Sequence, residues 1–325
     1  MYNTDTINKR LAMKYLIGID GGGTKTSFLL AEQTGKIINK IELPTTHYLQ
    51  CGFSEMAARL KEGITTIIGN INSKDILSIA ICLAGYTDSA DDDLLIEKVI
   101  QKELAGYPYK IYSDTVNAHR GALLGKPGIN LIAGTGSIAF GIDDNGKSVR
   151  CGGWNHMFGG DEGSAYWLGC KLILEFTRQS DGRDPRTELY TYVRNKFNLS
   201  DDGEIIVRTV EEMGFKREEI ALLAKDVSYL ANKGDTYAIN IYNQAAEELF
   251  EMVNSLVKRL HFNKPILVSG TGGVFKSGDC LLKPLEKKLE SINAKFIKAA
   301  LPPDKGSVIV AALDKGMDIS SYIIQ

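Results

Sequence analysis

The chain lacks long hydrophobic runs and an excess of charge of either sign. Its 325 residues contain 38 Lys and Arg against 40 Asp and Glu, a formal net charge of −2. No basic face wide enough to neutralise many phosphates is implied, so nucleic acid is not an expected partner. Residues 1–14 contain no apolar segment as long as a secretion signal needs, and no later run approaches a membrane span. We therefore expect a cytoplasmic protein that does not bind a membrane.

Metal-binding and disulfide patterns are also missing. The cysteines are odd in number, scattered and without a CxxC pair, a usage typical of reduced, mostly buried thiols: Cys51, Cys82, Cys151, Cys170 and Cys280. The four histidines lie too far apart for a helical HxxxH pair: His47, His119, His156 and His261. No zinc site is expected.

The length exceeds what one hydrophobic core usually organises, and a composition of 44% hydrophobic and 24% charged residues is ordinary for a globular protein. We expect a flexible N-terminal extension over 1–13, because that stretch is polar and without pattern. Two domains should follow, over 14–117 and 118–325. The sequence leaves open whether the last helix packs back on the first domain and whether the chain forms a homodimer.

The first domain begins with a glycine loop inside a predicted hairpin. The apolar run 15–19 ends at Asp20 and three glycines, and residues 26–30 then alternate as a second strand. A turn at Thr34-Gly35 leads to a third strand. The remaining predicted elements are a helix over 54–68, a strand over 76–83, a helix over 91–104 and a strand over 109–112.

The same pattern starts again in the second half. An apolar run over 129–133 ends in Gly134-Thr135-Gly136-Ser137, residues 138–142 alternate, and a turn at 144–147 leads to a further strand. Strand, glycine loop, strand, turn and strand thus occur twice, which predicts an internal duplication and two related domains that face one another. The later elements are a largely helical stretch over 161–261, clearest over 237–260, a strand over 265–268, a third glycine loop over 270–273, and helices from 277 and over 307–313.

Two common phosphate-binding motifs fail on their context. The P-loop pattern nearly fits from Gly18 to Gly23, but Thr24 stands where Lys is required and a strand follows instead of a helix. The dinucleotide pattern GxGxxA fits Gly134 to Ala139, and again a strand follows. What remains is a pair of glycine hairpins whose backbone N–H groups can approach phosphate oxygens and form anion-binding nests. A single loop is more often only a tight turn; two loops in matching contexts, with a third at 270–273, favour phosphate binding.

Three stretches resemble a known family. They are Leu16–Thr26 (LIGIDGGGTKT), Ile132–Ser137 (IAGTGS) and Gly152–Trp167 (GGWNHMFGGDEGSAYW). They resemble the BadF/BadG/BcrA/BcrD ATPase family and, within it, the N-acetylglucosamine kinase branch, over residues 15 to 315. The resemblance implies an α/β protein of the actin-like, sugar kinase and Hsp70 ATPase fold, with two ribonuclease-H-like domains flanking a nucleotide cleft. It also implies an ATP-dependent kinase of a small amino sugar.

The resemblance assigns roles to individual residues. It places Thr24 and Thr135 on ATP phosphates, Gly272 and Lys276 beside the adenosine, and makes Asp114 the catalytic base. With the loop residues, the expected ATP set is Asp20, Gly21, Gly22, Gly23, Thr24, Lys25, Gly134, Thr135, Gly136, Gly272, Gly273 and Lys276. Asp20 would hold Mg²⁺ through water, since Mg²⁺ keeps several waters beside phosphates. From the residues alone, Asp114 is more simply a helix N-cap before 116–123, a role that Ser113 could equally serve.

On the sugar side, the family's substrate positions fall on Ser137, Gly153, Trp154, Asn155 and Asp161. A Trp beside polar groups suits a carbohydrate, although Trp154 could be ordinary core packing and Asp161-Glu162 could be acids that open a helix. This chain has one residue more than usual between the Trp and the Asp of the motif. Thr46, beside His47 in the expected substrate set, stands where the animal kinases have Asn. The shorter side chain admits glucosamine or N-acetylmuramic acid as well as N-acetylglucosamine.

The expected mechanism is proton acceptance by Asp114 from the sugar's 6-hydroxyl, with the loops and Mg²⁺ stabilising phosphate charge. Its main competitor is the other branch of the family, ATPases that activate an iron–sulfur dehydratase or reductase and need suitably placed cysteines. A non-catalytic sugar sensor and an actin-like assembly protein also stay open. A glucokinase of the repressor and kinase type would normally have a cysteine-rich zinc motif that this sequence lacks.

Overall fold

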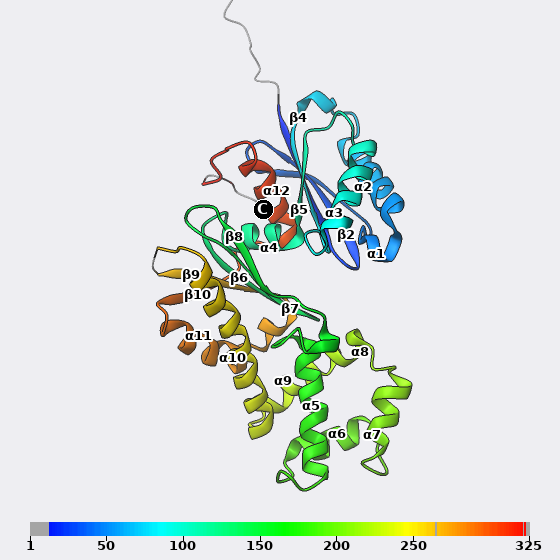
Figure 1. Cartoon of the computed structure of the whole chain (residues 1–325), viewed down its shortest axis with the longest axis vertical. Coiled ribbons are helices and arrows are strands. Elements are labelled where there is room, and N and C mark those ends of the chain that lie inside the picture. The colour runs from blue at the N-terminus through cyan, green and yellow to red at the C-terminus, as the bar shows by residue number, and fades with distance from the viewer. Residues whose placement is uncertain (1–12, 264, 321, 323–325) are drawn as a thin grey trace, which may run out of the picture. The chain divides into compact units, whose positions relative to one another are not determined.

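The computed structural model describes residues 13–263, 265–320 and 322, which form two compact units (Figure 1). The first unit comprises the described residues through Lys126 and those from Ala299 on; the second is Pro127–Lys298. All but one residue of the predicted extension over 1–13 lie outside the described residues. The predicted boundary between 117 and 118 falls inside helix α4 (Asp114–Ala122), which belongs wholly to the first unit.

The first unit is built on a mixed five-stranded sheet of order β3-β2-β1-β4-β5. Its strands are β1 (Tyr15–Gly21), β2 (Lys25–Glu32), β3 (Ile37–Pro44), β4 (Ile76–Leu83) and β5 (Tyr109–Ser113). The first three pair antiparallel, and β4 and β5 run parallel to β1. The glycine loop therefore lies inside a β-hairpin, as predicted, and the carboxyl ends of β1, β4 and β5 share one edge of the sheet.

Helices cover both faces of this sheet. They are α1 (Tyr48–Cys51), α2 (Phe53–Ile68), the short 3₁₀ turn η1 (Ser73–Asp75), α3 (Ala90–Glu103), α4 and α12 (Pro303–Leu313). Both faces need cover because alternate side chains of β1 point to opposite sides of the sheet and are apolar. Ile17 and Ile19 join the core beneath α2 and α3, whereas Leu16 packs with residues of α12. The C-terminal helix is thus part of the first unit's core.

Glycines let α12 approach its neighbours backbone to backbone. A Cβ added at Gly18 of β1 would lie 2.2 Å from Ser307 Oγ and 2.5 Å from Val308 N, and one added at Gly306 would lie 2.0 Å from Asn117 O. Any larger residue at either position would collide with main-chain atoms. The close contact of α12 with β1 and α4 therefore depends on these two glycines.

The second unit repeats the arrangement of the first. Its sheet has the order β10-β9-β6-β7-β8, with β6 (Gly128–Ala133), β7 (Ser137–Ile142), β8 (Ser148–Gly152), β9 (Ile266–Thr271) and β10 (Ala294–Lys298). Three antiparallel strands again stand beside two parallel ones. The two sheets confirm the predicted duplication and the α/β fold. Strand β10 was not among the predicted elements.

The helices of the second unit follow mostly as one insertion between β8 and β9. In order they are η2 (His156–Phe158), α5 (Ala165–Ser180), α6 (Glu188–Lys196), α7 (Glu204–Ile206), the π-helical η3 (Val207–Glu212), α8 (Arg217–Leu222), α9 (Ala224–Asn232) and α10 (Thr236–Arg259), with η4 (Gly273–Ser277) and α11 (Asp279–Glu290) after β9. Helix α10 confirms the predicted periodicity, because the four residues of its predicted face are fully buried: Ala238, Ile241, Ala245 and Leu249.

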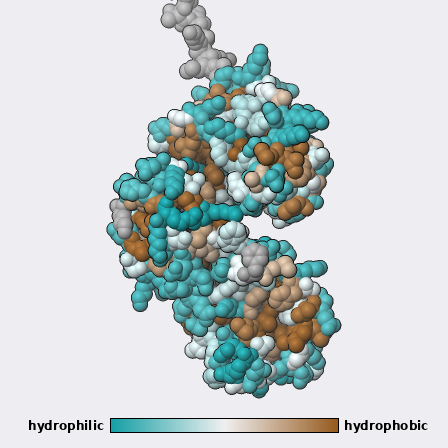
Figure 2. Space-filling view, viewed as in Figure 1, coloured by the Kyte–Doolittle hydropathy of each residue, from teal (hydrophilic) through white to brown (hydrophobic). Residues whose placement is uncertain are grey.

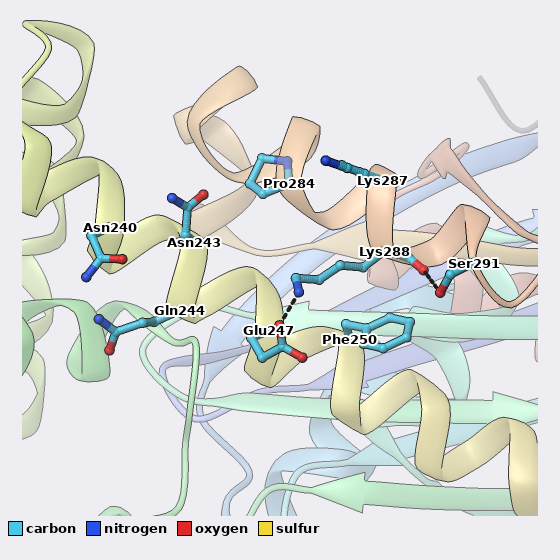
Figure 3. A pocket seen from close by; sticks show the side chains of 9 residues that line it. All are labelled: Asn240, Asn243, Gln244, Glu247, Phe250, Pro284, Lys287, Lys288 and Ser291. Atoms are coloured by element: carbon cyan, nitrogen blue, oxygen red, sulfur yellow. Dashed lines mark hydrogen bonds and ion pairs between the residues drawn. The ribbon is translucent and has the colours of Figure 1, made fainter.

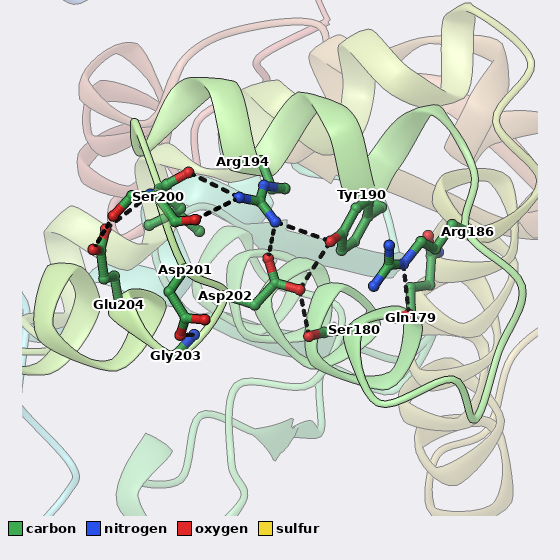
Figure 4. A network of polar contacts seen from close by, with 11 residues as sticks. Gln179, Ser180, Arg186, Tyr190, Arg194, Ser200, Asp201, Asp202, Gly203 and Glu204 are labelled. Atoms are coloured by element: carbon green, nitrogen blue, oxygen red, sulfur yellow. Dashed lines mark hydrogen bonds and ion pairs between the residues drawn. The ribbon is translucent and has the colours of Figure 1, made fainter.

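A polar network fixes the distal part of this insertion (Figure 4). The carboxylate of Asp202 accepts hydrogen bonds from Ser180 Oγ at 2.6 Å, Tyr190 OH at 2.9 Å and Arg194 Nη1 at 2.6 Å. Arg194 also donates to two main-chain carbonyls of the loop that follows α6. One carboxylate therefore joins α5, α6 and that loop.

Apolar side chains nevertheless remain at the surface beside this network. Ile206 is 62% and Val210 51% exposed, on α7 and η3. The space-filling view shows hydrophobic surface over this part of the second unit (Figure 2). These side chains lie outside the core and contribute little to its packing.

Candidate active site

Two aspartates lie at the carboxyl edge of the first sheet. Asp20 lies at the end of β1, and Asp114 begins α4 directly after β5. Asp20 Oδ1 accepts a hydrogen bond from Asn117 Nδ2 at 2.7 Å, and the same nitrogen donates to Pro303 O at 3.0 Å. Helix α4 and the start of α12 thus hold the Asp20 side chain in place.

Asp114 is not the cap of its helix. Ser113 is the N-cap of α4, with its Oγ accepting from Thr115 N at 3.4 Å, so the N-cap interpretation of Asp114 was wrong. Burial, followed by the negative charge of Asp20, raises the pKa of Asp114 to about 6. Burial likewise raises the pKa of Asp20, against the opposing effect of the Asn117 hydrogen bond. A carboxyl group with a raised pKa is suited to accept a proton near neutral pH.

The first glycine loop is fastened through its carbonyl groups. Thr45 Oγ1 donates to Gly22 O at 2.7 Å, and Gln50 Nε2 donates to Gly23 O at 2.9 Å. Gly23, Thr24 and Lys25 are exposed, and Lys25 Nζ pairs with Glu42 Oε1 at 2.6 Å. The loop therefore presents exposed glycine and threonine from a fixed base, as a phosphate-binding loop requires.

Gly21 is confined much more tightly than its neighbours. A Cβ there would lie 2.7 Å from Thr46 Oγ1 and 2.8 Å from Leu83 Cδ2. Thr46 itself is 1% exposed and its Oγ1 lies 2.9 Å from Thr26 Oγ1. Its hydroxyl is therefore engaged inside the first unit.

His47, next to Thr46, is half-buried and caps α1 by accepting from Leu49 N through Nδ1 at 3.3 Å. Burial lowers the pKa of His47, and the charge of Asp88 opposes this in part. The imidazole is accordingly neutral at neutral pH and can act as an acceptor as well as a donor.

The second and third glycine loops lie side by side in the second unit. Ala165 N donates to Gly134 O at 2.9 Å and Tyr166 N to Thr135 O at 3.2 Å, so the second loop is attached to the start of α5. Gly272 has φ +105°, and a Cβ there would lie 2.3 Å from Ala133 O. The two loops meet because they follow β6 and β9, which are parallel neighbours.

A cavity of about 370 Å³ opens beside these loops. It is lined from α5, α8, α9, α10 and η4 by Ala165, Leu168, Ala221, Ala224, Lys225, Ser228, Tyr242, Gly273, Val274, Lys276 and Ser277. Gly273 and Lys276, both predicted from the sequence, are among them. A mainly apolar pocket with a few polar groups at its edge is suited to a flat heteroaromatic ring.

Asp161 is fixed by the chain itself. It is 3% exposed with φ +68°; its Oδ1 accepts from Ser137 N at 3.1 Å, and its Oδ2 lies 2.5 Å from Arg217 Nη2. Ser164 is the N-cap of α5, so the interpretation of Asp161 as a helix-opening acid was wrong. Arg217 belongs to no sequence motif and lies 56 residues from its partner, which is why the sequence did not reveal it.

Trp154 lies at the surface and not in the core. It is 62% exposed, and the guanidinium carbon of Arg150 lies 5.5 Å from the centre of its ring. Gly153, with φ +72°, donates its N–H to Ser137 O at 2.9 Å, and exposed Asn155 accepts from Met157 N at 2.9 Å. The core-packing interpretation of Trp154 was therefore wrong. The loop presents an aromatic face directly after Gly153, which is hydrogen-bonded to Ser137, one of the two residues that hold Asp161.

A larger groove of about 680 Å³ lies between α10 and α11 (Figure 3). Three carboxamides of α10 line it, Asn240, Asn243 and Gln244, and further along the same helix Glu247 forms an ion pair with Lys288 of α11. It contains no predicted site residue.

Among the described residues, no helix is long and apolar enough to cross a membrane.

The sequence model of the BadF/BadG/BcrA/BcrD ATPase family matches residues 17–309, most of the chain. The chain belongs to this family. The N-acetylmuramic acid/N-acetylglucosamine kinase of Clostridium acetobutylicum is 32% identical over 305 residues, which cover 92% of this chain and 98% of that protein. The N-acetyl-D-glucosamine kinase of Dictyostelium discoideum is 28% identical, covering 94% of this chain and 100% of that protein.

Solved structures show the same fold. A protein of Chromobacterium violaceum, provisionally named as an N-acetylglucosamine kinase, superimposes with a TM-score of 0.69 at 21% identity, covering 92% of this chain and 99% of that one. The family member described here therefore has the two-domain, actin-like sugar kinase fold that the sequence predicted.

Proposed function

We propose that this family member is an ATP-dependent kinase that phosphorylates an amino sugar at its 6-hydroxyl. The observation that supports it most is Asp114, a half-buried carboxyl group whose pKa is raised by burial and by the charge of Asp20, and which is not used as a helix cap. Relatives that match almost the whole chain are named as kinases of N-acetylmuramic acid and N-acetylglucosamine.

The nucleotide is assigned to three loops and one cavity. Thr24 and Thr135, with the glycines beside them, bind the phosphates through loop amides and hydroxyls. The adenosine occupies the 370 Å³ cavity, which Gly273 and Lys276 help to line. Gly272 directly precedes Gly273 in the third loop. The family resemblance suggests this assignment, and the glycine content of the three loops supports it, because glycine lets backbone N–H groups approach phosphate oxygens.

Magnesium fits the first unit. Two carboxyl groups with raised pKa, Asp20 and Asp114, lie close enough for the charge of one to raise the pKa of the other, and a nearby cation would relieve this repulsion. Mg²⁺ prefers oxygen ligands and retains water, so Asp20 would hold it through water. Bound there, the ion would neutralise charge on the phosphates.

The acceptor hydroxyl is assigned to Asp114, which takes its proton as the phosphoryl group is transferred. Trp154 offers a face to the sugar ring, and Ser137, Gly153, Asn155 and Asp161 offer polar groups around it. His47 adds a group from the first unit, and the buried Thr46, whose hydroxyl is engaged with Thr26, acts by holding the segment that carries His47. N-acetylglucosamine, N-acetylmuramic acid and glucosamine are the candidate substrates. A cytoplasmic kinase of such sugars would serve the recovery of cell-wall amino sugars.

The direct test is sugar-stimulated ADP release by the purified protein with Mg²⁺-ATP. Glucosamine, N-acetylglucosamine, N-acetylmuramic acid and glucose form the panel, and phosphorus-coupled NMR of the product identifies the phosphorylated carbon. We expect turnover with at least one of the amino sugars and a 6-phosphate product. ADP release that no sugar stimulates, from a protein that purifies with iron, would instead favour the dehydratase-activating branch of the family.

A further inference from the structure

Arg217 stands outside every sequence motif, yet it lies against both Asp161 and the glycine loop at Gly136. We propose that Arg217 is a positioning residue that orients Asp161 for the amino sugar and holds the neighbouring Gly134–Ser137 loop. The inference rests on the proposed kinase function and assigns to it a residue that neither the family resemblance nor the relatives pointed to.

The guanidinium group lies between a carboxylate and a loop backbone. Arg217 Nη2 is 2.5 Å from Asp161 Oδ2, and a Cβ added at Gly136 would lie 2.1 Å from the same nitrogen. The cation therefore occupies the space that a side chain at position 136 would need. A single group thus sets the position of both the carboxylate and the middle of the loop.

Asp161 needs such a partner because it is almost fully buried. Its side chain is 4% exposed, and that of Arg217 is 34% exposed. A buried carboxylate without a compensating cation is strongly unfavourable. Ser137 N supplies the second contact at 3.1 Å, so one oxygen is held by the loop and the other by α8.

The arrangement leaves capacity for a ligand. A carboxylate has about four lone-pair sites, and the two contacts described here use one on each oxygen. Sugar hydroxyls can donate to the others if the carboxylate keeps its orientation. Ser137 is held by Asp161 and the residue after it, since its N–H donates to Asp161 and its Oγ donates to Glu162 O at 2.6 Å. A shift of Asp161 would therefore move two predicted sugar contacts together.

The test compares Arg217→Met and Arg217→Lys with the wild-type enzyme. Displacement of a positioned group by about 1 Å can cost on the order of 100-fold, so for Arg217→Met we expect a KM for the sugar roughly 10- to 100-fold higher. The KM for ATP should rise less, through the contact of Arg217 with the loop at Gly136. Arg217→Lys should recover part of the loss, because an ammonium group can still pair with Asp161.

Arg178→Met is the matched control. Arg178 also belongs to the second unit and pairs with an aspartate, Asp184, at 2.5 Å, with its side chain 37% exposed. It contacts none of the glycine loops in the described structure, and its replacement should leave both KM values unchanged. Equal effects of the two substitutions would overturn the proposal.

A double-mutant cycle covers the case in which Arg217→Met folds poorly. If Arg217 acts through Asp161, the Arg217→Lys/Asp161→Asn double variant should raise the sugar KM no more than Asp161→Asn alone. Additive effects, or a sugar KM that Arg217→Met leaves at the wild-type value, would remove the positioning role while leaving the kinase intact. A wild-type enzyme that transfers no phosphate would instead overturn the proposed function.

Discussion

The two glycine hairpins occupy equivalent places in two sheets of the same strand arrangement, but the residues around them differ. Both connect the first two strands of a sheet with the same strand pattern. The first follows Asp20 and has Asp114 at the same sheet edge. The second has no acid of its own, is attached to the start of α5, and lies against Asp161, which is already paired with Arg217.

The two units thus share one strand arrangement and differ in the side chains around their loops. The first unit has half-buried acids with raised pKa, suited to proton transfer and to a hydrated cation. The second has a carboxylate neutralised by arginine, an exposed Trp154 and a cavity, suited to binding and orientation. Two glycine loops at equivalent places in related sheets can therefore have different roles.

The strongest test of this difference between the units is to replace Asp114, the proposed base. We expect Asp114→Asn to lower kcat by roughly 10²- to 10⁴-fold, the usual contribution of a general base, and to leave ATP binding close to normal. Steady-state kinetics and calorimetric titration with ATP measure the two effects. The control is Asp75→Asn, a substitution near the surface at the other end of the same sheet. It should leave both kcat and ATP binding unchanged. Retained turnover would show that the first unit does not supply the base.

A second test asks whether both hairpins are equally confined. Added Cβ atoms at Gly21 and Gly136 would lie under 3 Å from neighbouring atoms, whereas one at Gly23 has nothing nearer than 3.8 Å and one at Gly134 has nothing within 4 Å. Alanine at Gly21 or Gly136 should lower the free energy of unfolding by about 1–3 kcal/mol, the usual cost of overpacking. Alanine at Gly23 or Gly134 should change it far less, as urea denaturation will show.

The third test uses pH. Because the pKa of Asp114 is raised to about 6, kcat/KM should fall about tenfold per unit as the pH drops below that value and the base becomes protonated. Replacing Asp20 by Asn removes the smaller cause of the shift, its charge, and leaves burial, so the acidic limb should move to lower pH. An unmoved limb would show that the charge of Asp20 does not act on Asp114.

The smallest effect is expected at Trp154. Loss of an aromatic face worth about 1 kcal/mol should raise the sugar KM roughly fivefold in Trp154→Ala. Stability should change by less than about 0.5 kcal/mol, since the side chain is exposed. Ile206→Ala is the matched control, because Ile206 is also 62% exposed. Equal sugar KM values in the two variants would remove Trp154 from the sugar site.

The sequence predicted the parts of the fold that local pattern determines. Strands β4 and β6 and helix α10 follow from apolar runs and helical periodicity, and the duplication follows from repeated turn residues. Strand β10 was missed because only five residues form it and lysines occupy two of them. Its pairing with β9 comes from the tertiary fold.

Side-chain environments were harder to predict than elements. Ser113 and Asp114 are both good cap residues, and only the structure shows that Ser113 takes the role. Whether Trp154 is buried depends on loop conformation, which Gly152 and Gly153 set with positive φ. Arg217 meets Asp161 only after the inserted helices have folded, and no local signal marks it.

Helix α12 has a consequence for the order in which the protein can form during synthesis. All residues of the second unit have been made once Lys298 leaves the ribosome, whereas the first unit lacks the helix that covers one face of its sheet until residues 303–313 follow. Leu16 and Ala80 share a hydrophobic cluster with residues of that helix, and Leu29 shares another with its Val308. Gly18 adds no side chain to this face of the sheet. The first unit is therefore completed after the second, and until then one face of its sheet lacks its covering helix.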